Sequence, residues 1–337
     1  MPSAISRPTE GRSVTRTGGT TLVTGAAGFV GRHLVRLLHA RGTAVRASDR
    51  ADGNRELFDA LGVEYVAADL TRAESLPPLF AGDVDRVFHL GAVCNFSTPY
   101  AKLHPINVVA VERMTELALA HGVRCFVHVS STSVYGRYRG TPFTEESPQE
   151  PQDDYGRSKR AGEAVVWRAV DRGLPAIVCR PCTVYGPGCT EGAGKAFSRR
   201  TSIPAIPGCG RQKLANVRVE DVARALVHLA ETPAAIGQAF NIADASQPTL
   251  GRALTLAAEV FGGTPPRLHV PLVVLTVLAR LQGVIAAYRG AIPELESDAV
   301  RYLRDDYVVD ASKIEATGFA LRFPDFEASL ATMATEG

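Results

Sequence analysis

Short apolar runs alternate along this chain with longer stretches in which apolar residues recur at helical spacing. The first run, Thr21 to Thr24, stops abruptly at Gly25, and from Phe29 to Gly42 the apolar side chains fall on one face of a predicted helix. Six more strand-like runs and two more helical stretches follow. The strands are expected at Ala44–Ser48, Val63–Ala67, Arg86–Leu90, Cys125–Val129, Ala176–Cys179 and Ala239–Ile242, and the helices at Pro105–Ala120 and Tyr155–Val170.

This alternation predicts an α/β fold. Strands that alternate with helices indicate parallel βαβ units with helices on both faces, and right-handed crossovers then give a Rossmann-like doubly wound sheet. Beyond Pro181 prolines and glycines become frequent, and the C-terminal third is predicted to be mostly helical. We therefore expect a disordered leader over 1–18, a Rossmann domain over 19–181 to which 216–245 returns, and a smaller, mostly helical substrate lobe built from 182–215 and 246–337.

Composition narrows the class of protein. The 337 residues are 45% apolar and 21% charged, with a net charge of +2 spread along the chain, so no nucleic-acid partner is expected. The six cysteines lack the spacing of a disulfide framework, and Cys179 and Cys182 have no second pair at zinc-ribbon distance, so no metal site is expected either. The leader lacks the apolar core of a signal peptide, which favours a cytoplasmic location.

The most apolar stretch of the chain runs from Val270 to Ala279. It is too short to cross a bilayer and is soon interrupted by Arg280 and Gln282. We expect a core or interface helix here. The alternative is contact with a membrane surface, because Arg280 and Arg289 could flank an interfacial helix.

Three glycines between the first strand and the first helix point to a dinucleotide. Gly25, Gly28 and Gly31 permit a tight turn and close backbone approach to a pyrophosphate, which the helix N-terminus would bind. Asp49 ends the second strand, 24 residues after Gly25, where a carboxylate can accept the hydroxyls of the adenosine ribose. We therefore predict NAD as cofactor, while the neighbouring Arg50 leaves NADP open.

A second motif, Tyr155-Gly156-Arg157-Ser158-Lys159, opens a predicted helix. The side chains of Tyr155 and Lys159 lie one turn apart on the same face. A free phenol is a poor base at neutral pH, because its pKa is about 10. An ammonium nearby stabilises the phenolate and lowers that pKa, so Tyr155 is the predicted acid–base group and Lys159 its partner and a ligand of the nicotinamide ribose.

Several further segments agree with one family in order. The Gly-x-x-Gly-x-x-Gly spacing, Asp69-Leu70, His89-Leu90-Gly91-Ala92, Asn107-Val108, the serine loop Ser130–Gly136, Arg180-Pro181, Val184–Gly188, Val219–Ala223 and Phe240-Asn241-Ile242 resemble the extended short-chain dehydrogenase/reductase family over about Thr20 to Ile242. The resemblance implies a homodimer formed through the helices at Pro105–Ala120 and Tyr155–Val170. It also implies that Ser131 polarises the substrate oxygen.

The resemblance carries further site residues onto this chain. The predicted cofactor-binding residues are Gly25, Gly28, Phe29, Val30, Gly31, Asp49, Arg50, Asp69, Leu70, Leu90, Gly91, Ala92, Tyr155, Lys159, Pro181 and Cys182. The predicted substrate-binding residues are Cys94, Thr132, Ser133, Thr183, Tyr185 and Arg218. Arg218 stands where an aromatic-x-His pattern is usual, and it is interpreted equally as a contact to an anionic substrate or as a surface or helix-cap charge.

Departures from the pattern indicate the branch of the family. Family dehydratases place Asp-Glu after the catalytic serine, where this chain has Thr132-Ser133, and sugar-nucleotide epimerases typically carry Asn at the position of Thr183. The segment from Arg180 to Gly188 resembles the 3β-hydroxysteroid dehydrogenase-like and flavanonol-reductase-like branch more closely. We expect reversible oxidation of a secondary alcohol on a steroid-like, polyketide or other secondary-metabolite substrate. A nucleotide-sugar epimerase or reductase is the alternative, and a non-catalytic dinucleotide sensor is a third.

Overall fold

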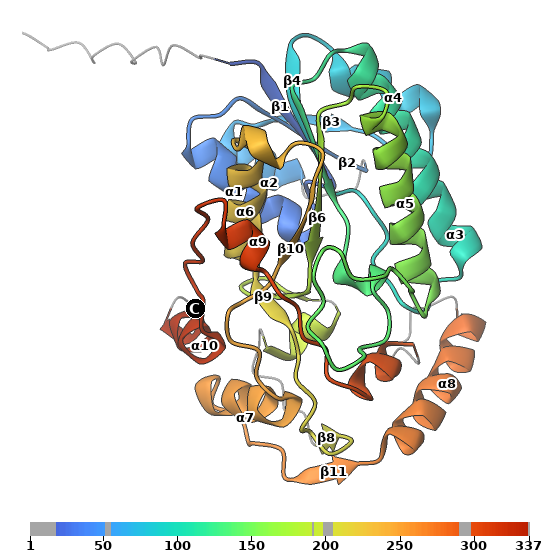
Figure 1. Cartoon of the computed structure of the whole chain (residues 1–337), viewed down its shortest axis with the longest axis vertical. Helices are drawn as coiled ribbons and strands as arrows, with labels where there is room; N and C mark the ends of the chain where they lie inside the picture. The colour runs from blue at the N-terminus through green and yellow to red at the C-terminus, as the bar shows by residue number, and fades with distance from the viewer. Residues whose placement is uncertain (1–17, 51–54, 191, 198–204, 290–297, 336–337) are drawn as a thin grey trace, which may run out of the picture.

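A computed structural model of the chain describes residues 18–50, 55–190, 192–197, 205–289 and 298–335. Apart from Gly18, the predicted leader lies outside the described residues. The chain forms a layered α/β body with a second group of elements below the sheet, where helices α7, α8 and α10 lie (Figure 1).

A seven-stranded parallel sheet forms the centre of the molecule, which confirms the predicted fold class. The strand order is β10-β6-β5-β4-β1-β2-β3, so the order reverses between β1 and β4 and leaves a crevice at their carboxyl ends. All seven predicted strands are present, within two residues at each end. They are β1 Thr20–Thr24, β2 Val45–Asp49, β3 Glu64–Ala67, β4 Val84–His89, β5 Cys125–Val129, β6 Ala176–Pro181 and β10 Ala239–Ile242.

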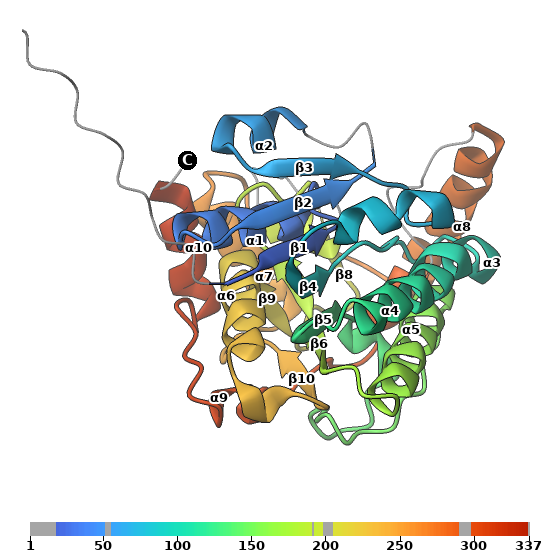
Figure 2. The same ribbon diagram turned by 90° about the horizontal axis from the view of Figure 1, so that it is seen from above.

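Helices cover both faces of the sheet, because successive strand residues point to opposite sides. On β1, Val23 packs in the cluster with helices α1 and α6, whereas its neighbour Leu22 packs in the cluster with α4 and α5. The two layers are visible from above in Figure 2. The helices of these layers and of the sheet edge are α1 Phe29–Ala40, α2 Arg55–Leu61, α3 Tyr100–His104, α4 Ala110–Ala120, α5 Asp154–Val170 and α6 Val219–Ala230, with the π-helical turn η3 Pro105–Val109 between α3 and α4.

Most of the remaining elements form a lobe with its own apolar core, in which Leu254 of α7 packs near Phe326 of α10 and Phe197. Two small parallel pairs, β7 with β9 and β8 with β11, belong to this part. The elements of this lobe are β7 Thr183–Tyr185, β8 Ala205–Pro207, β9 Asn216–Arg218, α7 Leu250–Val260, β11 Leu268–Val270, α8 Leu272–Arg289, α10 Phe326–Thr335 and the short turns η5 Ala193–Phe197 and η7 Ala299–Leu303. Helix α9 Ser312–Glu315 and the turns η1 Ala73–Ser75, η2 Pro77–Phe80, η4 Thr132–Val134 and η6 Pro233–Ala235 lie with the sheet and its helices instead.

The chain crosses back to the sheet more often than the sequence indicates. Strand β10 extends the main sheet beside β6, in the segment predicted to return. In addition, Val309, Ile314 and Phe319 pack in the core on the α1 side of the sheet, although this segment was assigned to the substrate lobe. The reason is that α9 lies against β10. A helix of only four residues has too short an apolar pattern for this contact to be predicted from the sequence.

Helix α8 is not the core helix that was one of its two predicted roles. Most of its large side chains are turned outward, and Val273 and Val284 are 73% and 70% exposed. Across the part of the chain that the structure describes, every helix falls short of the length and apolarity needed to cross a bilayer.

Candidate active site

The glycine turn between β1 and α1 has room for backbone only. Gly25 has a φ of +68°, and a Cβ there would lie 2.6 Å from the backbone nitrogen of Gly91. A Cβ on Gly31 would lie 2.1 Å from the carbonyl oxygen of Gly25. Helix α1 therefore begins tightly against the sheet, with Phe29 and Val30 in its first turn and no side chain at its N-cap, Gly28. This arrangement fits a pyrophosphate, which needs accessible N–H groups at a helix N-terminus.

The carboxylate of Asp49 lies beside this turn. One oxygen accepts a hydrogen bond from the N–H of Ala27 at 2.9 Å, and the other accepts from the backbone N–H of Arg50 at 2.9 Å. The hydroxyl of Tyr65 donates to the carbonyl of Arg50 at 2.5 Å. Strand β2 thus ends with an acid fixed next to the phosphate turn, where a ribose acceptor is predicted.

Further predicted cofactor residues lie near the neighbouring strand ends. Asp69 accepts hydrogen bonds from the N–H and hydroxyl of Thr71, which hold the pKa of its carboxyl below the usual range. Leu70 lies so near Gly91 that a Cβ there would be 2.3 Å from the leucine Cδ1. Leu90 donates its N–H to the carbonyl of Thr24, so Leu90, Gly91 and Ala92 follow β4 directly beside β1.

Ser131 and Tyr155, which are 24 residues apart, come together at the carboxyl end of the sheet. The Tyr155 side chain hydrogen-bonds with Ser131 and with Cys94. Ser131 caps the turn η4, and its Oγ lies 3.1 Å from the Oγ of Ser133. Burial raises the pKa of Tyr155 well above its usual range, the Cys94 contact raises it further, and the Ser131 bond opposes them. In this structure the phenol form is therefore favoured.

Lys159 lies one turn after Tyr155 on the buried face of α5. Its Nζ donates to the carbonyl of Val129, at the end of β5, over 2.7 Å. Burial lowers the pKa of Lys159 to about 8, against the opposing influence of Cys94 and Glu163. Burial, with a smaller contribution from Lys159, also lowers the pKa of His89 to about 3. The ammonium therefore donates to a backbone carbonyl and lies near an imidazole that stays neutral.

The start of α5 is fixed by Asp153, a residue that the sequence analysis did not select. One carboxylate oxygen caps the helix by accepting from the N–H of Gly156 at 2.7 Å. The other accepts from the hydroxyl of Tyr302 at 2.5 Å. An aspartate just before a predicted helix is a recognisable N-cap signal, but its contact with Tyr302 is not local.

An aromatic wall stands next to Tyr155. The ring of Phe96 meets the ring of Tyr155 edge-on at 5.3 Å and lies 5.3 Å from Tyr302, which is itself 5.6 Å from Tyr307. The hydroxyl of Tyr307 donates to the carbonyl of Thr132 at 2.5 Å. Sequence reasoning missed these contacts, because Phe96 and Tyr302 are about two hundred residues apart. Tyr302 and Tyr307 also line a cavity of about 470 Å³, together with Leu272 and Thr276 of α8 and several charged side chains.

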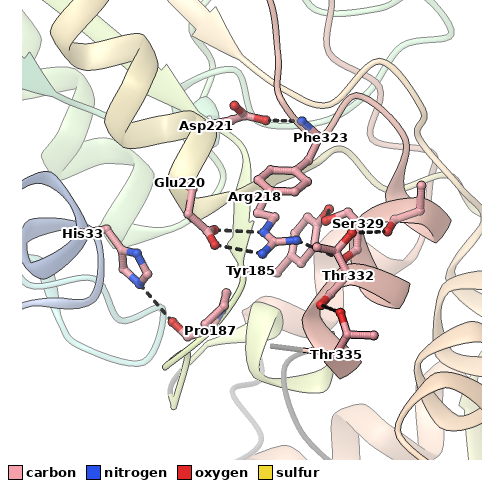
Figure 3. Close-up of polar contacts among 11 residues, drawn as sticks. His33, Tyr185, Pro187, Arg218, Glu220, Asp221, Phe323, Ser329, Thr332 and Thr335 are labelled. Carbon is pink, nitrogen blue, oxygen red and sulfur yellow. Dashed lines mark hydrogen bonds and ion pairs between the residues drawn. The ribbon is translucent and has the colours of Figure 1, made fainter. Parts of the chain in front are cut away.

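Two predicted substrate residues have structural partners instead. Arg218 is fully buried: its guanidinium donates two bonds to Glu220 (2.9 and 3.0 Å) and one to the carbonyl of Ser329, and it stacks on Phe323 at 3.7 Å (Figure 3). It therefore serves neither as a receptor for a substrate anion nor as a surface charge; it stands at the N-cap position of α6 and pairs with Glu220 in the first turn of that helix. Its donors are used inside the lobe, where they connect β9 to α10.

Tyr185 belongs to the same buried group (Figure 3). Its side chain is 0% exposed, and its hydroxyl hydrogen-bonds with Asp244 at 2.9 Å and Ser329 at 2.8 Å. The prediction that Tyr185 contacts substrate is therefore wrong in this structure, since the ring is covered and the hydroxyl is occupied.

The other predicted residues lie near the sheet end. Thr132 and Ser133 form the buried turn η4, whereas Cys94 is exposed as a residue and reaches Tyr155 through its thiol. Pro181 pairs with Ile242 at the end of β6, the N–H of Cys182 donates to the carbonyl of Ile242 at 3.1 Å, and Thr183 begins β7.

Together the glycine turn, the sheet order and the Ser131–Tyr155–Lys159 group define the class as an extended short-chain dehydrogenase/reductase. The chain belongs to the NAD-dependent epimerase/dehydratase family, whose model matches residues 21–243. It is accordingly an NAD-dependent enzyme, which confirms the predicted class and cofactor.

Curated relatives include enzymes acting on lipids and on sugars. The chain is 36% identical over 172 residues to sterol demethylase protein B of Methylococcus capsulatus, covering 50% of this chain and 52% of that protein, so it spans about half that relative's length. It is 34% identical to UDP-glucose 4-epimerase of Mycolicibacterium smegmatis (74% and 86% covered). It is 32% identical to ceramide reductase of Caulobacter vibrioides (75% and 74%).

Among solved structures, MoeE5 in complex with UDP-glucose and NAD is similar, with a TM-score of 0.72 and 26% identity. The match covers 94% of this chain and 98% of that one. The similarity therefore includes the elements below the sheet as well as the Rossmann part.

Proposed function

We propose that this enzyme interconverts a secondary alcohol and a ketone on an apolar substrate, with Tyr155 as the acid–base group. One observation carries the proposal: the Tyr155 hydroxyl is buried in contact with Ser131, and the ammonium of Lys159 lies one turn further along α5. A hydroxyl that donates and a phenol that exchanges a proton are the two groups that carbonyl reduction requires at one oxygen.

Ser131, Tyr155 and Lys159 would each have a separate role in the reaction. Ser131 would donate a hydrogen bond to the substrate oxygen and stabilise negative charge that develops there. Tyr155 would give its proton to that oxygen in reduction and take it back in oxidation. Lys159 would supply positive charge that stabilises the phenolate left behind. When bound, the cofactor would accept the hydride in its oxidised form, NAD⁺, or supply it in its reduced form, NADH.

The cofactor would lie along the glycine turn and the adjacent strand ends. Gly25, Gly28 and Gly31 would admit the pyrophosphate, and the Asp49 carboxylate would accept the ribose hydroxyls. Phe29 and Val30 would follow in α1, and Arg50 would stand at the ribose edge. The remaining proposed contacts are Asp69, Leu70, Leu90, Gly91, Ala92, Pro181 and Cys182.

An apolar substrate is favoured by the surroundings of Tyr155. The rings of Phe96, Tyr302 and Tyr307 form an aromatic wall next to Tyr155, and aromatic side chains predominate in the walls of pockets for apolar ligands. The chain is similar to ceramide reductase and to sterol demethylase protein B, whose names indicate lipid substrates. Cys94, Thr132, Ser133 and Thr183 would complete the substrate contacts.

UDP-sugar epimerisation is the second candidate, supported by the similarity to UDP-glucose 4-epimerase over 86% of that protein. Two features of this chain weigh against it. Thr183 stands where sugar-nucleotide epimerases typically have Asn, and the guanidinium of Arg218 is enclosed by Glu220 and Phe323. A rise in Tm with UDP-glucose that exceeds the rise with an apolar ketone would favour this candidate.

Assembly and location also stay proposals. We expect a cytoplasmic homodimer in which α4 and α5 of each copy form the interface, and sedimentation of the purified protein measures the assembly directly.

The test of the main proposal is Tyr155→Phe. We expect kcat for oxidation of an apolar secondary alcohol, followed as NADH absorbance, to fall by about 10²- to 10⁴-fold. The Kd for NAD should stay within about twofold, because the phenol oxygen reacts at the substrate. Full turnover in the variant would refute the assignment. Tight NAD binding without hydride transfer across a broad panel of alcohols by the unmodified enzyme would instead indicate a sensor.

A further inference from the structure

Helix α8 exposes its large apolar side chains and buries small ones. The structure describes nine exposed large apolar side chains; all lie between Leu268 and Tyr288, and eight of them are in α8. The side chains that α8 buries are small, with Ala279 and Ala286 only 1% and 7% exposed. An ordinary surface helix buries its large apolar residues and exposes polar ones. The outward face of α8 therefore has the composition of a buried face.

The exposed side chains form one continuous band. Successive residues of an α-helix are about 100° apart, so the eight side chains fill an arc of about 140° with Val273 at one border and Leu278 at the other. Arg280 lies about 20° beyond the first border and Arg289 about 20° beyond the second. Both arginines are exposed. The outward face is thus an apolar band bordered on each side by a cation.

The charge of this segment is one-sided. Residues Thr264 to Pro293 contain three arginines, Arg267, Arg280 and Arg289, and no aspartate or glutamate, in a chain whose net charge is only +2. A second copy of this chain would bring the same cationic borders together on a shared face. An anionic surface with an apolar interior is complementary to both features.

We propose that α8 docks this enzyme onto the surface of an anionic lipid bilayer. The helix lies in the plane of the interface with its apolar band among the acyl chains, as amphipathic interfacial helices do. The side chains of Arg280 and Arg289 extend sideways from the borders of the band to lipid phosphates.

The position of α8 also suggests what the docking serves. Leu272, Val273, Thr276 and Arg280 of α8 line the 470 Å³ cavity, as do Tyr302 and Tyr307. Tyr302 contacts Phe96, which contacts Tyr155. A ketone or alcohol carried by a membrane lipid would therefore enter beside α8 and reach the aromatic wall. This second step rests on the proposed function, whereas the docking rests on α8 alone.

The test is flotation of the full-length protein with phosphatidylglycerol vesicles and with phosphatidylcholine vesicles. We expect binding to phosphatidylglycerol that weakens as salt is added, and weaker binding to phosphatidylcholine. The double substitution Val277→Glu/Leu281→Glu places charges in the middle of the band and should weaken binding about a hundredfold. The matched control, Ala328→Glu/Ala331→Glu, adds the same charge to exposed positions of α10 and should float like the unmodified protein.

Several outcomes would overturn the docking. They are failure of the unmodified protein to bind anionic vesicles, equal binding by the α8 variant, or sedimentation showing a dimer that the α8 substitution converts to monomers. Turnover of a short, water-soluble alcohol separates the two proposals, because Val277 and Leu281 do not line the cavity. That turnover should be unchanged in the α8 variant, while Tyr155→Phe should abolish it and still float.

Discussion

Helices α5 and α8 are nearly equal in length and depart from ordinary amphipathicity in opposite ways. Helix α5 buries three ionisable groups at four-residue spacing, Tyr155, Lys159 and Glu163. Helix α8 exposes eight large apolar side chains. Every buried ionisable group of α5 has a partner inside the molecule, whereas the band of α8 has none among the described residues. We infer that the buried face of α5 carries the reacting groups, whereas the exposed face of α8 contacts the surroundings of the enzyme.

The buried ion pair should show the largest stability effect. The carboxylate of Glu163 accepts two hydrogen bonds from the guanidinium of Arg180, at 2.9 and 2.7 Å, and both side chains are almost fully buried. Glu163→Ala would leave the guanidinium uncompensated and should lower the free energy of unfolding by about 3–5 kcal/mol. Chemical denaturation measures this. The exposed Glu112→Ala on α4 is the control, with a change expected within about 0.5 kcal/mol.

Lys159 should make stability depend on pH in a defined window. Its pKa is lowered by burial from 10.5 to about 8, so between these values the unfolded chain binds more protons and stability rises with pH. Relative to Lys159→Met, the enzyme should gain about 3 kcal/mol between pH 7 and pH 10.5. Urea titrations of both proteins at several pH values give this difference. A constant difference would mean that Lys159 is not buried as a cation.

A matched pair of glycines compares the packing of the two helices. A Cβ at Gly162 of α5 would lie 2.6 Å from the carbonyl oxygen of Asn107, whereas nothing lies within 4 Å of one at Gly283 of α8. Gly162→Ala should destabilise by about 1–3 kcal/mol through overpacking. Gly283→Ala should instead stabilise by up to about 1 kcal/mol through helix propensity. Thermal unfolding distinguishes them by the sign of the change in Tm.

The smallest change in the free energy of unfolding is expected from a substitution within the apolar band of α8. Leu281 is 58% exposed, so Leu281→Glu should change the free energy of unfolding by no more than about 0.5 kcal/mol in the absence of vesicles. Denaturation in buffer without lipid measures it. A loss above 1 kcal/mol would show that this side chain is packed within the protein or against a second copy. That result would contradict the inference that the exposed face of α8 contacts the surroundings of the enzyme.

Local patterns in the sequence predicted the sheet and the reactive helix. The seven strands are short runs that contain apolar residues and alternate with helical patterns, and the spacing of Tyr155 and Lys159 within one helix fixes their common face. Helix α8 could not be oriented in this way, because apolar residues occur all round it and periodicity then says nothing about which side is covered. Its exposure depends on small residues such as Ala279 fitting against the body.

The errors at the site have a different origin. Arg218 is the last residue of the short strand β9, and nothing near it in the sequence indicates burial. Its burial depends on Phe323 and Ser329, more than a hundred residues away. The aromatic wall is equally non-local. Chemistry carried by one turn of helix can be predicted from sequence, whereas the partners that cover a side chain come from the whole fold.

The carboxylate of Asp153 has a consequence for how the two parts of the enzyme communicate. One oxygen caps the helix that carries Tyr155, and the other holds the hydroxyl of Tyr302 in the lobe beneath. A ligand that displaces Tyr302 would therefore also displace the cap of α5, which would couple substrate binding in the lobe to the position of Tyr155.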